Sequence, residues 1–272
     1  MKRLAIWNYH PAEVLAFGLT SGAVPSPYTD IVRWEPLQCF RGLQQGAVST
    51  ALIPTLQVLR SPDAFDVAPH VGIVTSAYPY VRLFLRKGLE AIEKVAFDPR
   101  YAQEILVTRI VLREHYQVMP AFIPKEQVAL ELLDTYDAVL LVGPEVPMIS
   151  SSYLALDIGQ EWFELTAYPM VWGLVAAQKG TMTVEEALAL KASAAFGAEN
   201  IDLWLQAAEP PEPIRQFLQE HFSPLLEGPA LGGLDELAEY FFFYGVLDEI
   251  PDIPFLDLPE EEDEGETPTE NK

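Results

Sequence analysis

Short apolar runs alternate with longer amphipathic stretches along most of the chain, which is the pattern of an α/β protein. The short runs predict strands over residues 4–7, 30–34, 48–53, 67–76, 81–85, 95–97 and 138–143. Apolar residues at helical spacing predict helices over 11–22, 36–45, 101–116, 125–133 and 183–196, with two or three more to about residue 247. Thr183 and Glu186 form a capping-box pattern at the start of one helix. From this alternation we expect mixed, mostly parallel sheets.

The composition indicates a folded chain with a strongly acidic surface. Of the 272 residues, 50% are apolar and 21% are charged, which is enough apolar sequence for a large core. Lys and Arg number 17 against 40 Asp and Glu, so the formal net charge is −23. This charge repels polyanions, and the sequence has no basic cluster to offset it. We therefore expect no nucleic-acid partner.

The sequence also lacks the signals of a membrane or secreted protein. No apolar run approaches the roughly 20 residues that span a bilayer, and residues 1–8 lack the apolar core of a signal peptide. Cys39 is the single cysteine, which rules out an intrachain disulfide. We therefore expect a cytoplasmic protein with no membrane partner. Residues 259–272 are strongly acidic and are expected to form a disordered tail.

Common cofactor and nucleophile motifs are absent from the sequence. It contains no GxGxxG, Walker A, HExxH, CxxC or GxSxG motif. The spacing of the four histidines predicts no metal site; they are His10, His70, His115 and His221. His115 falls late in a predicted helix beside Glu114, where the helix dipole favours a positive charge. The sequence therefore offers no recognisable motif for a metal or an organic cofactor.

Three polar segments follow predicted strands and are candidates for ligand binding. Asn8–Pro11 lies at a strand-to-helix turn, where free N–H groups bind carboxylates, although Asn8 could simply cap the helix. Residues 46–55 bring hydroxyls to the end of a strand, where α/β proteins bind ligands, or they only cap that strand. Residues 98–104 begin another helix, and Glu104 there could simply complement the dipole.

Taken in chain order, these segments resemble the chorismate dehydratase family of menaquinone biosynthesis by the futalosine route (MqnA, with MqnD more distant). The similarity begins at the Asn-x-x-Pro turn of Asn8–Pro11 and covers about residues 3–250. Its most specific part is Asp157–Trp162 followed by Thr166–Val171. These segments are similar to the family's Asp-Leu-Gly-x-x-Trp and Thr-Gly-x-Pro-Phe-Val signature. Within them, Asp157 and Trp162 are expected to anchor and pack a loop before serving any site role.

The resemblance implies a two-lobed clamshell like the type II periplasmic binding proteins, with residues 1–85 and 173–258 in the first lobe and 86–172 in the second. It implies a cytoplasmic enzyme that removes water from chorismate to give 3-[(1-carboxyvinyl)oxy]benzoate without a metal or an organic cofactor. We expect Asn8 to be the catalytic residue that orients the ligand, a small carboxylate. Thr55 and Tyr80 from the first lobe and Gln103 from the second are expected to bind it.

The sequence departs from the family at the expected site. Ser49 stands where the family commonly has an acid, and Tyr101–Glu104 replaces a Ser-Arg-Thr-Ser run that would hold a carboxylate. Three arginines could offset the added charge of Glu104: Arg82, Arg86 and Arg100. Three hypotheses remain, namely a dehydratase with a remodelled site, a non-catalytic solute-binding protein of the same fold, and an enzyme acting on another small carboxylate. The similarity along the whole chain favours the dehydratase.

Overall fold

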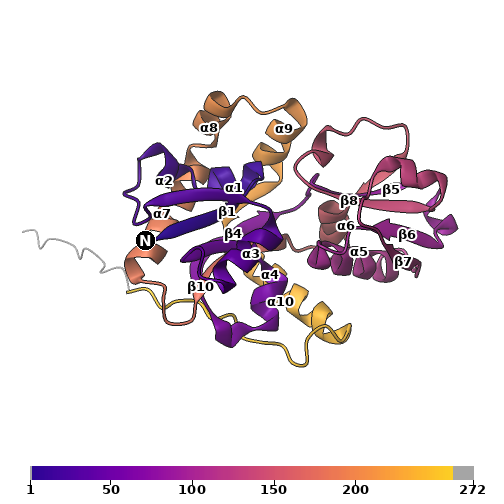
Figure 1. Cartoon of the computed structure of the whole chain (residues 1–272). Helices are drawn as coiled ribbons and strands as arrows, with labels where there is room; N and C mark the ends of the chain where they lie inside the picture. The colour runs from indigo at the N-terminus through magenta and orange to yellow at the C-terminus, as the bar shows by residue number, and fades with distance from the viewer. Residues whose placement is uncertain (1, 260–272) are drawn as a thin grey trace, which may run out of the picture.

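The computed structural model describes residues 2–259, which form two lobes side by side, each built on its own β-sheet (Figure 1). The first sheet has the order β11-β4-β10-β3-β1-β2, with β1 (Arg3–Trp7), β2 (Asp30–Trp34), β3 (Thr50–Pro54), β4 (Phe65–Thr75), β10 (Met170–Gln178) and β11 (Phe222–Leu225). The second has the order β7-β6-β8-β5-β9, with β5 (Val81–Leu85), β6 (Lys94–Phe97), β7 (Ala121–Pro124), β8 (Ala138–Val142) and β9 (Leu154–Asp157). The expected two-lobed α/β architecture is confirmed.

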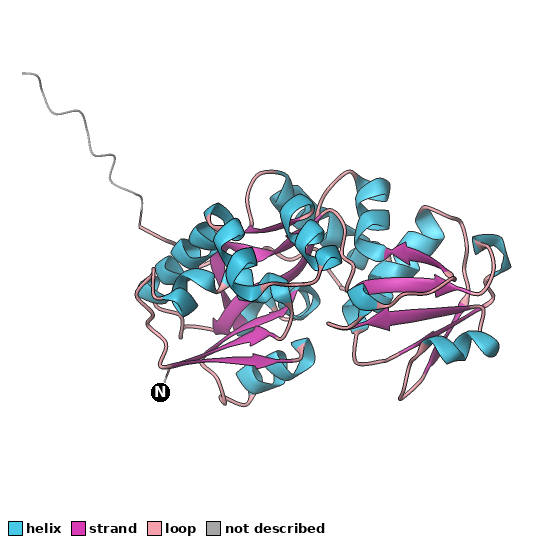
Figure 2. Ribbon diagram, turned by 90° about the horizontal axis from the view of Figure 1, so that it is seen from above, coloured by secondary structure: helices cyan, strands magenta, loops and turns pink. Residues whose placement is uncertain are grey.

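Helices cover both faces of the first sheet and pack against the second (Figures 1 and 2). The helices of the first lobe are α1 (His10–Leu15), α2 (Phe17–Ser21), α3 (Pro36–Gln44), α4 (Thr55–Arg60), α7 (Val184–Glu199), α8 (Ile201–Ala208), α9 (Glu212–Glu220) and α10 (Pro229–Phe243). Those of the second lobe are α5 (Ala102–Glu114) and α6 (Ile158–Thr166). None of the helices between residues 2 and 259 is long and apolar enough to cross a membrane.

The chain passes between the lobes at points that differ from those expected. Strand β5 (Val81–Leu85) pairs with β8 and β9 of the second sheet, although residues 81–85 were expected in the first lobe. Strand β10 already pairs with β4 at Met170, so the first sheet resumes before residue 173. The crossovers are therefore residues 76–80 and 167–169. The expected boundaries at 85 and 172 were wrong because both fall inside apolar strands, and apolar runs do not reveal which sheet they join.

Two other expectations need correction. Among the described residues, four strand pairs are parallel and five are antiparallel, so the sheets are mixed but not mostly parallel. Four of the five antiparallel pairs involve β5 or β10, the strands that follow the crossovers. The fifth is the edge pair β11–β4. The helix expected over 125–133 is only a 3₁₀ helix at Leu130–Asp134. The expected acidic tail at 259–272 lies almost wholly outside the described residues.

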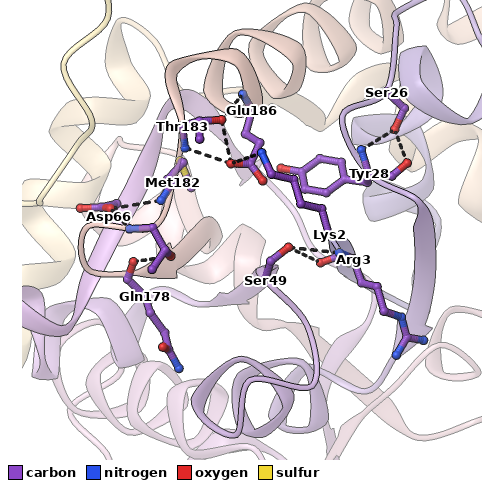
Figure 3. Close-up of polar contacts among 11 residues, drawn as sticks. Lys2, Arg3, Ser26, Tyr28, Ser49, Asp66, Gln178, Met182, Thr183 and Glu186 are labelled. Carbon is purple, nitrogen blue, oxygen red and sulfur yellow. Dashed lines mark hydrogen bonds and ion pairs between the residues drawn. The ribbon is translucent and has the colours of Figure 1, made fainter.

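The amino end of α7 is fixed by the capping box that its sequence predicts (Figure 3). The Thr183 hydroxyl accepts a hydrogen bond from the Glu186 N–H at 3.2 Å, and Glu186 accepts one from the Thr183 N–H at 2.9 Å. Lys2 forms an ion pair with the same carboxylate at 3.2 Å, which ties α7 to the start of β1. The Asp66 carboxylate accepts a bond from the Gly180 N–H at 2.7 Å and holds the preceding turn. This end of the first lobe is therefore a structural anchor.

Helix α10 packs against the second crossover and reaches the second lobe. A Cβ atom at Gly233 would lie 2.0 Å from the Pro169 carbonyl oxygen, so only glycine allows this close approach. Just after the helix, the Tyr244 hydroxyl donates a hydrogen bond to Glu114 of α5 at 2.5 Å. The last helix therefore connects the lobes a third time, in addition to the two backbone crossovers.

Candidate functional site between the lobes

The first turn of α5 holds the two lobes together. The Gln103 side chain is 1% exposed and makes two hydrogen bonds to the backbone of the first lobe. Its amide nitrogen donates to the Trp172 carbonyl oxygen, and its amide oxygen accepts from the Leu56 N–H, both at 2.7 Å. Beside it, the Tyr101 hydroxyl donates to Glu35 of the first lobe at 3.4 Å. The lobes are therefore closed against each other at this point.

Five buried aromatic residues line the same boundary and are called here the interlobe aromatic cluster: Trp7, Tyr9, Tyr78, Tyr80 and Trp172. Tyr9 stacks on Tyr80 with ring centroids 5.2 Å apart, and Tyr78 stacks on Trp172 at 4.7 Å. The elements explain this placement, because Tyr9 lies two residues after β1, Tyr78 and Tyr80 lie in the first crossover, and Trp172 lies in β10. The cluster therefore gathers side chains from the points where the chain enters and leaves the first lobe.

Two hydroxyls of this cluster are buried without a hydrogen-bond partner among the described residues. They belong to Tyr9 and Tyr78, whereas the indole nitrogens of the cluster donate to Leu52 and Thr75. Burial raises the pKa of both phenols well above the ordinary value, so they are neutral donors at any physiological pH. Unpaired buried polar groups are rare in folded proteins, so these two hydroxyls call for an explanation.

Glu104 has the burial and the pKa of a catalytic acid or base. It lies in the first turn of α5, is 6% exposed, and burial raises its pKa to about 7. The charge of Glu104 contributes to the raised pKa of Tyr9 and Tyr78, which places the carboxyl within electrostatic range of both hydroxyls. A carboxyl group with a pKa near neutrality can both give and take a proton at working pH.

The arginines that could offset Glu104 are occupied elsewhere. Arg100 pairs with Asp98 at 2.6 Å, Arg86 pairs with Asp137, and the charge of Arg82 acts on Asp157. Burial rather than a cation therefore limits the negative charge of Glu104, since its protonated form is neutral below about pH 7. The sequence places an acidic residue where the family has a run that would hold a carboxylate. A partly protonated Glu104 repels an anionic ligand less than a fixed negative charge would.

The residues predicted from the sequence differ in how free their polar atoms are. Asn8 is exposed, does not cap α1, and donates to Glu35 at 3.0 Å, the carboxylate that also contacts Tyr101 of the second lobe. Thr55 is fully buried and its hydroxyl donates to the Val171 carbonyl oxygen at 2.7 Å. Asn8 thus faces the other lobe, whereas the proton of Thr55 is already used within the first.

Tyr80 and Gln103 lie on opposite sides of the lobe boundary. The Tyr80 hydroxyl is 3.0 Å from His10 Nδ1, and burial lowers the pKa of His10, which favours its neutral form. Gln103 faces the first lobe, as expected, but through backbone groups that it already occupies. Ser49, the position of the family's acid, bonds instead to the Arg3 backbone at the far end of β3 (Figure 3).

The sequence profile of the menaquinone biosynthesis family matches residues 2–241. The chain belongs to that family. A chorismate dehydratase from Thermus thermophilus is 26% identical over 163 residues, covering 53% of this chain and 59% of that enzyme. The match therefore spans less than two thirds of the relative's length.

Solved structures share the fold of this menaquinone biosynthesis family member. An Archaeoglobus fulgidus protein superposes with a TM-score of 0.68 at 18% identity, covering 90% of this chain and 98% of that one. The periplasmic aliphatic sulphonate binding protein of Escherichia coli gives 0.58 at 14% identity, covering 99% and 97%. At these identities the similarity shows the fold alone, which is that of the periplasmic binding proteins.

The structure explains the family-like signature as the anchor of the first crossover. Asp157 caps α6 by accepting from the N–H groups of Gly159 and Gln160, and it also accepts from the Tyr78 N–H at 2.6 Å. A Cβ atom at Gly159 would lie 2.6 Å from the Tyr78 nitrogen, so glycine is required there. Trp162 is fully buried. Asp157 and Trp162 thus have the structural roles expected of them, and Asp157 also positions Tyr78.

A separate pocket of about 500 Å³ opens at the carboxyl ends of β6 and β8 in the second lobe. Its charged lining comprises one base and four acids: Arg100, Asp98, Glu126, Glu131 and Glu145. Since Arg100 is already paired with Asp98, the pocket is unsuited to an anionic ligand.

Sequence reasoning missed Tyr9 and Tyr78 and treated Glu104 as an obstacle. Tyr9 is part of the Asn8–Pro11 turn that had been selected, and Tyr78 falls two residues before Tyr80. Their position beside predicted strand ends was the available signal. Neither tyrosine could be assigned from it, because only the fold brings them together.

Proposed function

We propose that the protein is a dehydratase that removes water from chorismate to give 3-[(1-carboxyvinyl)oxy]benzoate, in the cytoplasm. The observation that carries the proposal is the buried Glu104 carboxyl, with its pKa of about 7, whose charge acts on two buried tyrosine hydroxyls that lack partners. Membership of the menaquinone biosynthesis family and the chorismate dehydratase relative support the choice of substrate. The proposed ligand is a small dicarboxylate held between the lobes.

The proposed reaction balances without an external oxidant or reductant. A C–H bond and a C–OH bond on adjacent ring carbons break, a C=C bond forms between those carbons, and water leaves as the ring becomes aromatic. Glu104 accepts the ring proton as a carboxylate and then gives it to the departing hydroxyl, so the group ends in its starting form. Its pKa of about 7 suits both halves of this exchange.

Neutral donors supply the remaining roles in this proposal. Tyr9 and Tyr78 donate to the substrate through their buried hydroxyls, and Asn8 orients the ligand through its exposed amide. Thr55 and Gln103 contribute to the wall of the site, and Gln103 must release the Leu56 N–H if that group is to bind a carboxylate. Tyr80 supports Tyr9 by stacking and is held by His10.

The test is turnover of chorismate by the purified full chain, followed by chromatography of the product. Glu104→Gln should reduce kcat by at least about 100-fold, because it removes the proton acceptor. Tyr78→Phe should reduce kcat/KM by about 10- to 100-fold through one lost hydrogen bond to a charged group. Tyr28→Phe is the matched control, since the Tyr28 hydroxyl is also buried but lies near Glu186 of α7 (Figure 3). Equal activity of the three variants would contradict the assignment.

A solute-binding protein of the same fold is the second candidate. The occupied Leu56 N–H and the lack of an arginine partner for Glu104 favour it, because both weaken a site for a dianion. Calorimetry with chorismate, run beside the turnover assay, separates the two proposals. Turnover supports the enzyme, whereas binding without turnover, or no binding of this dianion, supports a solute-binding protein.

A further inference from the structure

Three side chains of metal-ligating type lie together on the second lobe, away from the interlobe aromatic cluster. His115 is the C-cap of α5, and Glu161 and Glu164 lie on α6. One potential ligand atom of each residue lies within 4.8 Å of those of the other two. The two glutamates face the same side of α6 because they are three residues apart on a helix. The cluster therefore joins the ends of two helices that pack together.

Each carboxylate of this cluster is oriented by a neighbouring donor. The Tyr116 hydroxyl donates to Glu161 Oε2, and the Gln160 amide nitrogen donates to Glu164 Oε1 at 2.9 Å. In each glutamate, one carboxylate oxygen is held by a hydrogen bond, and the other oxygen is left to bind an ion. The His115 ring stands at 89° to the Tyr116 ring, with centroids 4.7 Å apart. Metal sites use outer donors of this kind to orient their ligands.

The charges of the cluster also favour a cation. Glu161 is 7% exposed, and an oxygen of the Glu164 carboxylate lies within 4.8 Å of one of its own. Two carboxylates held close together in a partly buried place repel each other, and a divalent ion removes that repulsion.

We propose that His115, Glu161 and Glu164 bind one divalent ion of the zinc class, which ties α5 to α6. Zinc accepts imidazole nitrogen and carboxylate oxygen at about 2.0–2.2 Å, so the three ligand atoms need to approach each other by only a small rotation of the exposed His115 and Glu164. An imidazole ligand favours zinc over magnesium, which prefers oxygen. The site is structural and independent of the proposed dehydration.

The experiment titrates the metal-free full chain with ZnCl₂ by calorimetry and follows CoCl₂ binding by visible absorption. The wild type should bind one Zn²⁺ at this site and show a cobalt d–d spectrum with bound nitrogen. His115→Ala and Glu164→Gln should each weaken binding by at least about 10-fold and abolish that spectrum. Both residues are exposed, so the variants should fold, and circular dichroism checks this. Tyr116→Phe should weaken zinc binding by about 10-fold through the lost outer donor.

His221→Ala is the matched control, because His221 is also exposed and lies 3.8 Å from the Glu220 carboxylate, outside the cluster. It should leave the zinc affinity of the cluster unchanged, and MgCl₂ should give no comparable heat with any form. Chorismate turnover, if present, should be the same in His115→Ala as in the wild type, which separates this proposal from the proposed function. The proposal is overturned if the wild type binds no zinc, or if His115→Ala binds it as tightly as the wild type does.

Discussion

Replacing Gln103 with alanine should weaken the closed arrangement of the two lobes by about 2 kcal/mol. The side chain makes two buried hydrogen bonds of 2.7 Å to the other lobe, to the Leu56 N–H and the Trp172 carbonyl oxygen. Each is worth about 1 kcal/mol net, whereas an unpaired buried group costs about 1–3 kcal/mol. If the lobes separate slightly, water reaches both backbone groups and neither is left unpaired. The cost is then only that of the two lost hydrogen bonds, about 2 kcal/mol. It corresponds to about a 30-fold change in the ratio of closed to open molecules.

Hydrogen exchange at the Leu56 amide measures this change directly, because that N–H lies in the first turn of α4 and its bond is to Gln103. Its protection should fall by about 30-fold in the variant, and small-angle scattering should show a larger radius of gyration. Gln178→Ala is the matched control, since the Gln178 amide also bonds backbone carbonyls, at Leu43 and Gln44, but within the first lobe. Unchanged Leu56 protection and an unchanged radius would refute the role of Gln103.

Three further variants test other parts of the structure. Burial raises the pKa of Glu104 to about 7, so its protonated form stabilises the fold at low pH. The free energy of unfolding should therefore fall by about 3 kcal/mol as the pH rises from about 4.5 to 7. Urea titrations of Glu104→Gln should not show this dependence on pH. Asp157→Ala should lower the free energy of unfolding by about 2–4 kcal/mol through the lost cap and the unpaired Tyr78 N–H, whereas Asp157→Asn should retain part of it. Gly159→Ala should lower the melting temperature, because its Cβ would clash with Tyr78, and a rise would contradict the close packing.

The sequence predicted those elements whose signals are local. Strands 30–34 and 81–85 have the expected bounds, and the capping box of α7 is as predicted. The helix expected over 125–133 failed because Val128, Leu130 and Leu132 recur at a spacing of two, which suits an extended or 3₁₀ segment better than an α-helix. Strand β11 was missed because Pro224 argues against a strand, although a strand at the edge of a sheet tolerates proline.

The candidate site was only partly accessible to the same reasoning. Asn8 and Gln103 could be selected because they lie next to strand ends and helix starts. The pairing of Tyr9 with Tyr78 depends on the first crossover passing beside the end of β1, which no local pattern encodes. The raised pKa of Glu104 is likewise a consequence of burial in the folded chain. Its carboxyl was therefore interpreted as a fixed charge when only its residue type was known.

The third connection made by α10 limits how the two lobes can move apart. Two backbone crossovers alone leave a pair of rigid bodies free to both bend and twist. Helix α10 is pinned at one end by Gly233 against Pro169, and the chain after it returns to the first lobe, where Leu256 donates to the Val67 carbonyl oxygen at 2.9 Å. Twisting would pull the Tyr244 hydroxyl away from Glu114, whereas bending about the axis of α10 need not. The molecule should therefore open more easily by bending than by twisting, because only twisting breaks that hydrogen bond.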